Sequence, residues 1–162
     1  MRPVICLCGK LCAGKSTIAR QLAAQCDGII LSTDQVLRSR YPQEHFENYE
    51  GILAGIREEL YTQAVALSKA GRTAILDWGF WERDQRDSFR KRFKEDHVEA
   101  RWLYICPPDA QWRSYIQKRN EEVLRAPSAE YYIDEGLLKK CIENFQEPSP
   151  DEGMEVIIPG EK

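Results

Sequence analysis

The residue types between positions 9 and 16 are those of a phosphate-binding loop. They read Gly-Lys-Leu-Cys-Ala-Gly-Lys-Ser, which fits the pattern G-x-x-x-x-G-K-[ST]. Glycines at such positions let successive backbone amides turn toward an anion. Lys15 is expected to reach the β- and γ-phosphates, and Ser16 to place its hydroxyl on Mg²⁺. The pattern predicts nucleoside triphosphate binding, with contacts from Gly9, Cys12, Ala13, Gly14, Lys15, Ser16 and Thr17.

Two carboxylates, Asp34 and Asp77, each follow a short apolar run. The run before Asp77 has the form of a Walker B strand, so this carboxylate is a candidate to hold Mg²⁺ with Ser16. Asp34 is a candidate to accept the proton of an attacking hydroxyl, with helix capping as the alternative. Arg38 lies one helical turn after Asp34, where it can either bind an anionic part of an acceptor or pair with Asp34.

Aromatic and basic side chains follow Asp77. Trp78 and Trp81 are candidates for stacking on a planar acceptor, and the alternative is that they cover the core. Arg83 and Arg86 share one side of an expected helix with Arg90. They can bind an acceptor phosphate or form a solvated face. Later in the chain, Arg119 and Arg125 flank a polar segment and are expected to neutralise charge on the transferring phosphate.

The elements that must position these residues alternate along the chain. Apolar, β-branched runs predict strands at residues 4–8, 28–31, 73–76, 98–106 and 155–158. Helical periodicity predicts helices over residues 15–27, 34–40, 45–70, 83–95, 109–119 and 133–145. This alternation predicts an α/β sandwich with a mostly parallel sheet. Ligands bind at the carboxyl ends of such strands, where the phosphate loop, Asp34 and Asp77 all fall.

Composition limits the class of protein. The length of 162 residues fits one domain, residues 1–162, and the net charge of −3 gives no basic footprint for general nucleic-acid binding. No apolar run approaches the roughly 20 residues that span a bilayer, so no membrane association and a cytoplasmic location are expected. Cys6 and Cys8 fit a buried strand better than a metal site, because no zinc-ligand spacing is present.

Taken together, these motifs resemble the small P-loop kinases related to polynucleotide 5′-hydroxyl kinase, chloramphenicol phosphotransferase, zeta-type toxins and adenylate kinase. The resemblance extends over essentially the whole chain. Its marks are residues 9–17, 32–34 with Arg38, 76–81 with Arg83 and Arg86, and 118–120 with Arg125. It implies a three-layer P-loop NTPase fold with a five-stranded, mostly parallel sheet in the order 2-3-1-4-5, helices on both faces and a small lid at about 119–132.

The resemblance also implies residue roles. Asp34 becomes the general base, Asp77 an acceptor-side carboxylate, and Arg119 and Arg125 lid residues, so Asp77 has two candidate roles. Residues 145–153 resemble a segment that helps to frame the adenine. Trp78 departs from the polynucleotide kinase pattern, which has a polar residue there, and this makes the expected acceptor site more aromatic and less basic.

The expected activity is ATP- and Mg²⁺-dependent transfer of the γ-phosphoryl group to a hydroxyl of a small molecule, nucleoside or nucleotide. One alternative is a 5′-hydroxyl polynucleotide kinase, with nucleic acid a less favoured acceptor. An alternative from another class is an NTP-binding regulatory protein without a dedicated acceptor. The oligomeric state is left open.

Overall fold

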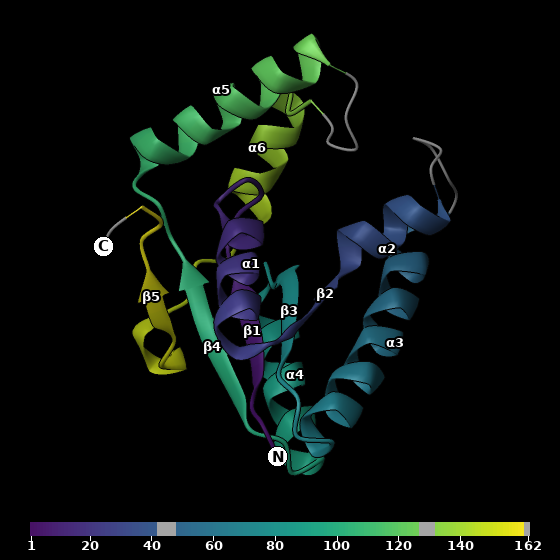
Figure 1. Ribbon diagram of the computed structural model, residues 1–162. Helices are drawn as coiled ribbons and strands as arrows, with labels where there is room; N and C mark the ends of the chain where they lie inside the picture. The colour runs from purple at the N-terminus through teal and green to yellow at the C-terminus, as the bar shows by residue number, and fades with distance from the viewer. Residues whose placement is uncertain (42–47, 127–131, 161–162) are drawn as a thin grey trace.

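Five parallel strands form the centre of the molecule. The computed structural model describes residues 1–41, 48–126 and 132–160. The sheet order is β2-β3-β1-β4-β5, and each neighbouring pair is parallel (Figure 1). This confirms the predicted order. The strands are β1 Val4–Cys8, β2 Ile29–Ser32, β3 Ala74–Gly79, β4 Ala100–Ile105 and β5 Glu155–Ile157.

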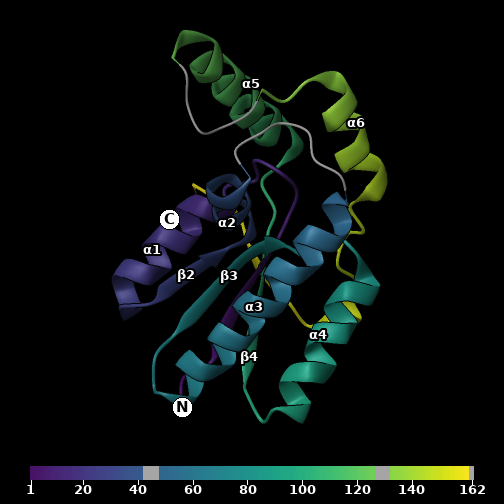
Figure 2. The same cartoon turned by 90° about the vertical axis from the view of Figure 1, so that its right-hand side faces the viewer.

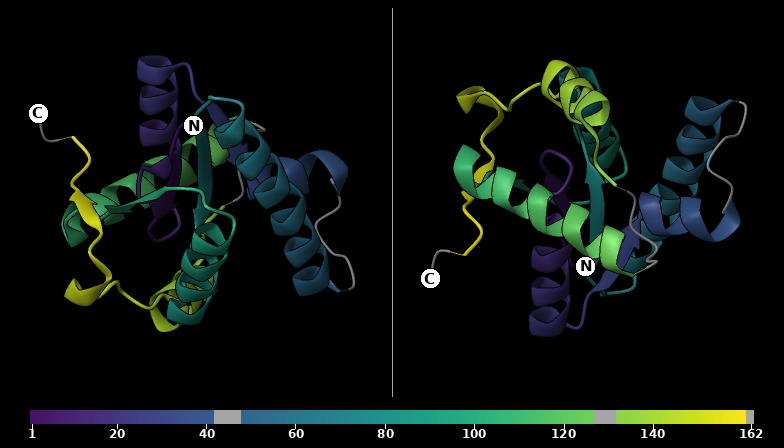
Figure 3. Two further views of the ribbon diagram at one scale, coloured as in Figure 1. Left: turned by 90° about the horizontal axis from the view of Figure 1, so that it is seen from below. Right: turned by 90° about the horizontal axis from the view of Figure 1, so that it is seen from above.

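Helices cover both faces of the sheet. Helix α1 Lys15–Cys26 lies on one face, and α3 Tyr49–Lys69 and α4 Arg83–Glu95 lie on the other (Figure 3). Two further helices, α5 Asp109–Arg125 and α6 Glu135–Asn144, lie beyond the carboxyl ends of the strands (Figure 1). A short helix, α2 Thr33–Arg40, follows β2, and a single 3₁₀ turn, η1 Pro150–Glu152, precedes β5. The start of the helix predicted over 45–70 lies outside the described residues.

The central strand β1 is buried throughout and sends alternate side chains to two cores. Ile5 and Leu7 pack on the α1 side, and Cys6 and Cys8 pack on the α3 and α4 side. Burial raises the pKa of Cys6 well above its usual value and raises that of Cys8 to about 12. Both thiols therefore behave as the small apolar core residues that the sequence predicts.

A third core joins the phosphate loop to α5 and α6. Leu11 and Ala13 pack there with Trp112, Ile116 and Cys141. The segment predicted as a polar loop from residue 120 is helical as far as Arg125. It lacks an apolar period because most of its residues face solvent, so its sequence gives no helical signal.

Asn120 ties the two helices together. Its side chain accepts from Ile133 N at 2.7 Å and donates to Ile133 O at 2.9 Å. The base of the predicted lid is therefore fixed on both sides, while residues 127–131 of that lid lie outside the described part. Among the described helices, none is long and apolar enough to cross a membrane.

Candidate active site

The phosphate loop, residues 9–16, connects β1 to α1 and adopts a backbone that requires glycine. Gly9 N donates to Gly79 O at 2.9 Å, and a Cβ at position 9 would lie 2.8 Å from Ile105 O. Neighbouring strands therefore enclose the start of the loop too closely for any side chain. Cys12 has φ 57° and Gly14 has φ 101°, so the backbone enters the left-handed region twice before the helix begins.

The start of α1 presents positive charge. Gly14 caps the helix without a side-chain hydrogen bond, and the first turn contains no acidic residue. The first N–H groups of a helix point outward and favour an anion. Lys15 Nζ donates to Gly9 O at 3.2 Å and to Lys10 O at 2.5 Å, which places the ammonium group inside the curve of the loop. Loop, helix end and lysine together form an anion site of the kind that triphosphates occupy.

Ser16 and Asp77 meet beside this anion site. Ser16 Oγ donates to Asp77 Oδ2 at 3.0 Å, although 61 residues separate them in sequence. Asp77 is half-buried on β3, where it lies in register with Leu7 of β1 and Ser32 of β2. A hydroxyl and a carboxylate at this distance are oxygen ligands of the type that Mg²⁺ prefers, so the residues fit a metal next to the phosphates.

Asp34 lies at the carboxyl end of the neighbouring strand. The N-cap of α2 is Ser32, whose hydroxyl accepts from Gln35 N at 3.3 Å. Asp34 is the second residue of the helix and is exposed. The helix cap is therefore Ser32 and not Asp34, which removes helix capping as the alternative role of Asp34. Partial burial raises the pKa of Tyr49, and the charge of Asp34 raises it further. Arg38 is half-buried one turn after Asp34.

Two contacts that the sequence does not predict hold the outer side of the loop. Trp112 Nε1 donates to Leu11 O at 2.9 Å, and the Lys10 ammonium lies 4.4 Å from the centre of the Trp112 ring. The chain after β5 also approaches the loop, because a Cβ on Gly14 would lie 3.3 Å from Pro159 Cγ. Contacts between segments 100 or more residues apart leave no local signal in sequence.

The two predicted lid arginines differ in position. Arg119 is seven residues after Trp112, so both lie on the face of α5 that turns toward the loop. Arg125 is exposed, points to a different side, and lies about 20 Å along the helix from Trp112. Arg125 therefore lies away from the phosphate loop in this structure, and the closure of both arginines over one triphosphate stays a prediction.

Trp78 is not an acceptor-binding residue. An extra residue in β3 at this position shifts the register with β1, and the strand continues to Gly79 instead of ending at Asp77. The shift directs the Trp78 indole into the core, where it is 8% exposed, stacks on Phe80 and donates to Leu31 O at 3.1 Å. Trp81 is half-buried and packs against Phe145, so it covers the core at the rim of the site.

The arginines of α4 are engaged elsewhere. Arg86 is fully buried and makes two hydrogen bonds to Glu152, at 2.7 and 3.1 Å. Arg83 pairs with Asp151 at 2.9 Å, and Arg90 pairs with Glu152 at 2.9 Å. The prediction that Arg83 and Arg86 bind the acceptor is therefore wrong, because their partners are carboxylates of the chain itself. The same contacts hold most of the segment 145–153 against α4 instead of against the phosphate loop.

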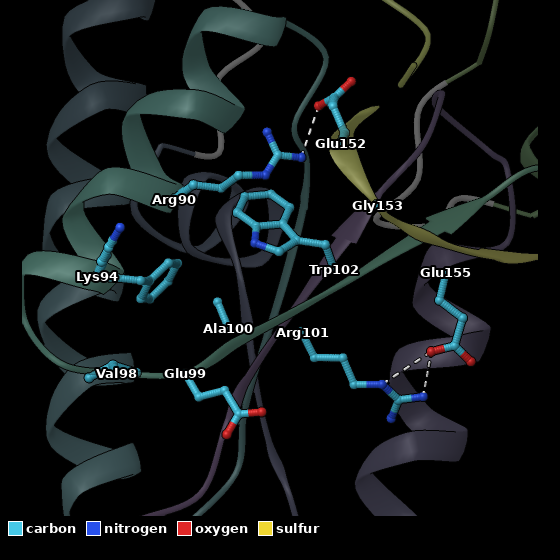
Figure 4. Close-up of a pocket in the computed structure, with 11 residues that line it drawn as sticks. Arg90, Lys94, Val98, Glu99, Ala100, Arg101, Trp102, Glu152, Gly153 and Glu155 are labelled. Carbon is cyan, nitrogen blue, oxygen red and sulfur yellow. Dashed lines mark hydrogen bonds and ion pairs between the residues drawn. The ribbon is translucent and has the colours of Figure 1, made fainter. Parts of the chain in front are cut away.

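A cavity of about 590 Å³ lies beside β4, at the end of the strand far from the loop (Figure 4). Arg90 is 4.7 Å from the centre of the Trp102 ring, and Arg101 pairs with Glu155 at 2.7 Å. Its wall includes the start of β4, whereas the phosphate loop follows the carboxyl end of β1. It is therefore separate from the candidate active site.

Comparison with known proteins gives the family. The model of the AAA_33 family, described as an AAA domain, matches residues 4–148. The chain belongs to this family. Among curated proteins, no sequence match is found for this AAA domain.

Solved structures resemble the AAA domain along its whole length. Kti12 from Chaetomium thermophilum, in complex with ADP-AlF3, has a TM-score of 0.72 at 18% identity, over 99% of this chain and 91% of that one. A gluconokinase from Sinorhizobium meliloti 1021 has a TM-score of 0.65 at 12% identity, over 100% and 86%. A sugar kinase from Janibacter sp. HTCC2649 has a TM-score of 0.62 at 16% identity, over 98% and 84%. The AAA domain thus shares its fold with Kti12 and with these two kinases.

Proposed function

We propose that this AAA domain is an ATP- and Mg²⁺-dependent phosphotransferase that moves the γ-phosphoryl group of ATP to a hydroxyl of a small molecule, nucleoside or nucleotide. The observation that carries the proposal is the Ser16–Asp77 contact of 3.0 Å at the phosphate loop. An exposed carboxylate, Asp34, lies beyond the adjacent strand. A binding loop alone needs no second carboxylate, whereas transfer to a hydroxyl needs a proton acceptor.

Each residue has a role that its position supports. Lys15 and the amides of the phosphate loop bind and orient the phosphates, so that little entropy is lost when the reaction begins. Ser16 and Asp77 would hold Mg²⁺, which when bound supplies positive charge to the transferring phosphate. Asp34 accepts the proton of the acceptor hydroxyl as that oxygen bonds to the γ-phosphorus, and the bond from this phosphorus to the β–γ bridging oxygen breaks to release ADP. Arg119 supplies further positive charge from α5.

Two observations favour a small acceptor. The basic run that could have extended the site along a nucleic acid is bound by Asp151 and Glu152. Two structural neighbours carry the names gluconokinase and sugar kinase. A 5′-hydroxyl polynucleotide kinase is therefore less favoured. The other alternative is a regulatory NTP-binding protein, and a screen of acceptors distinguishes it from a kinase.

The substitution Asp34→Asn tests the proposal. We expect transfer from labelled ATP to fall about 100-fold or more, because general-base catalysis contributes that much, while the dissociation constant for ATP stays within about twofold. Transfer is measured on a panel of hydroxyl compounds that includes a 5′-hydroxyl oligonucleotide. Asp109→Asn is the matched control, since Asp109 is also an exposed acid in the first turn of a helix.

Two outcomes would contradict the proposal. Full transfer by the Asp34→Asn variant would remove Asp34 from the base role. ATP binding with no transfer to any member of the panel would support the regulatory alternative.

A further inference from the structure

The first half of β4 is a free edge of the sheet. Strand β5 pairs only with the second half of β4, because its register begins with Glu155 opposite Leu103. The residues from Ala100 to Trp102 pair with β1 on their inner side, and none of the described strands pairs with them on the outer side (Figure 1). Gly153 takes the left-handed conformation with φ 64°, so the chain enters β5 from η1 and does not continue along this edge.

Backbone polar groups point outward along this free edge. Val4 N donates to Glu99 O at 2.9 Å, so the carbonyl group of Glu99 faces β1. Successive residues of a strand turn their N–H and C=O groups to alternate sides, so those of Ala100 and Trp102 face away from β1. Further along the strand, Cys106 N donates to the last residue of β5 at 2.8 Å, which fits the same alternation. The free edge therefore offers hydrogen-bond donors and acceptors to an added extended chain.

The free edge opens into the cavity beside β4, whose volume of about 590 Å³ is in the range of ligand sites (Figure 4). Figure 4 shows the side chains of Ala100 and Trp102 on one side of β4 and that of Arg101 on the other. The apolar part of the wall includes Phe93 and Val98. Because α4 bounds the cavity on one side and η1 and β5 on the other, a single extended chain fits it better than the edge of a second copy's sheet.

Two charged side chains of the cavity wall have no ion-pair partner within the described part of the chain. They are Lys94 at the end of α4 and Glu99 just before β4, and both are exposed. The other four charged side chains of the wall form two ion pairs with one another. Lys94 lies on the α4 side of the free edge, whereas Glu99 points to the opposite side, as Arg101 does (Figure 4). An added strand would send alternate side chains to these two sides.

We propose that the free edge of β4 binds an extended segment of a partner protein in which an acidic and a basic side chain are adjacent. The backbone of the segment pairs with Ala100 and Trp102, its acidic side chain faces Lys94, and its basic side chain faces Glu99. Main-chain hydrogen bonds supply affinity in this mode of binding, and the alternate side chains supply selectivity. The proposal does not depend on phosphoryl transfer.

Two peptides of the same composition test the charge pattern. They are acetyl-Thr-Glu-Arg-Ile-Thr-amide and acetyl-Thr-Arg-Glu-Ile-Thr-amide, and in each the isoleucine favours the apolar cavity. The first peptide then places its glutamate on the Lys94 side and its arginine on the Glu99 side, and the second reverses the two charges. We expect the first to bind about tenfold more tightly, because two exposed ion pairs become two repulsions in the second. Titration of the whole isotope-labelled chain, followed by NMR, measures both dissociation constants.

Hydrogen exchange tests the strand geometry residue by residue. The amide of Arg101 faces β1 and should exchange slowly in the free protein, whereas those of Ala100 and Trp102 should exchange fast. The first peptide, at about ten times its dissociation constant, should slow exchange at Ala100 and Trp102 about tenfold and leave Arg101 unchanged. Binding that slows neither of the two outward amides would overturn the proposal.

Charge reversal in the protein provides the matched variant. The double substitution Lys94→Glu with Glu99→Lys should reverse the preference, so that the second peptide binds more tightly than the first. Both positions are exposed, so we expect the fold and its melting temperature to be retained. Lys91→Glu is the control, because Lys91 is another exposed lysine of α4 but pairs with Glu95. It should keep the preference of the wild type.

Three other results would overturn the proposal. One is equal affinity of the wild type for the two peptides, or a preference that the double variant keeps. Another is that neither peptide binds at millimolar concentration. The third is a dimer, detected by sedimentation, that protects the same two amides without peptide and so assigns the edge to a second copy. ATP binding and transfer should not change in the double variant, so the outcome is independent of the proposed kinase activity.

Discussion

At the scale of a residue, the helix face on which a side chain lies determines whether it turns toward the phosphate loop, as Arg119 and Arg125 show. Both are on α5, six residues apart, and six residues correspond to about 1.7 turns. They therefore project from different sides of the helix. Arg119 shares its side with Trp112, whose indole contacts the phosphate loop, and Arg125 is exposed.

We expect Arg119→Met to lower kcat about 100-fold, because an arginine placed on a transferring phosphate contributes at least that much. Arg125→Met should change kcat less than about threefold. Steady-state transfer assays at saturating ATP measure both. Equal losses for the two variants would show that α5 moves far more than its contacts imply.

Trp112 supports the loop through one hydrogen bond. In Trp112→Phe the ring still fills the core, but the carbonyl of Leu11 loses its partner, which costs about 2 kcal/mol. We expect this loss in urea unfolding, together with a several-fold weaker affinity for ATP measured by calorimetry. Trp102→Phe is the matched control, because Trp102 lines the distant cavity. An affinity for ATP that does not change would mean that the loop keeps its shape without α5.

Single residues could be predicted where a motif fixes them in the chain. Ser16 and Asp77 come from two such motifs, and their contact follows from the parallel sheet. Trp78 and Arg86 could not be placed in the same way. One extra residue in β3 turns Trp78 into the core, and the partner of Arg86 lies 66 residues away.

At the scale of elements, η1 and α4 form a clamp made of Glu152, Arg86 and Arg90. The side chains of Arg86 and Glu152 are each only 1% exposed. Burial alone would raise the pKa of Glu152, but hydrogen bonds from Arg86, from the Ser149 backbone and from Arg90 lower it to about 2. The clamp fixes the chain between α6 and β5 against the core.

Glu152→Gln should destabilise the fold by about 3 kcal/mol, because it leaves the buried Arg86 charge uncompensated. The pKa of Glu152 is lower in the folded than in the unfolded chain, so its contribution is complete above about pH 4.5. It is lost as the pH falls from there toward 2. Urea unfolding between pH 7 and pH 3 should show a smaller decrease for the variant than for the wild type. Parallel decreases would assign the acid sensitivity to other groups.

Elements could be predicted from sequence to the extent that they bury one side. The buried strands and the helices that cover the sheet have clear periods, and the structure confirms the five strands and their order. The last turns of α5 are solvated on most sides and carry no period. Asp27 closes α1 in the left-handed conformation with φ 50°, a position that glycine more often occupies.

At the scale of the whole molecule, the phosphate loop is the junction of distant parts of the chain. It contacts the end of β3 through Gly79, α5 through Trp112 and the C-terminal segment through Pro159. A ligand that orders this loop therefore stabilises contacts from both halves of the sequence. We therefore expect nucleotide binding to raise the free energy of global unfolding, and not only to stabilise one local segment.

We expect ATP with Mg²⁺, at about 100 times its dissociation constant, to stabilise the fold by about 2.7 kcal/mol. For a chain of this size that corresponds to a rise of about 5–10 °C in melting temperature. Lys15→Met should abolish most of the rise, and removal of Mg²⁺ by EDTA should reduce it. Differential scanning fluorimetry measures all three. An equal rise for Lys15→Met would place the nucleotide elsewhere.

The hydrogen bond between Trp112 and Leu11 also gives the protein a built-in optical probe. An indole is the chain's strongest fluorophore, and this one is 2% exposed with its N–H held by the loop itself. Any movement of Leu11 changes the polarity at the indole nitrogen and hence the emission. With Trp78, Trp81 and Trp102 replaced by phenylalanine, Trp112 would be the remaining indole of the four in the sequence, and nucleotide arrival could be followed in real time in the unlabelled protein.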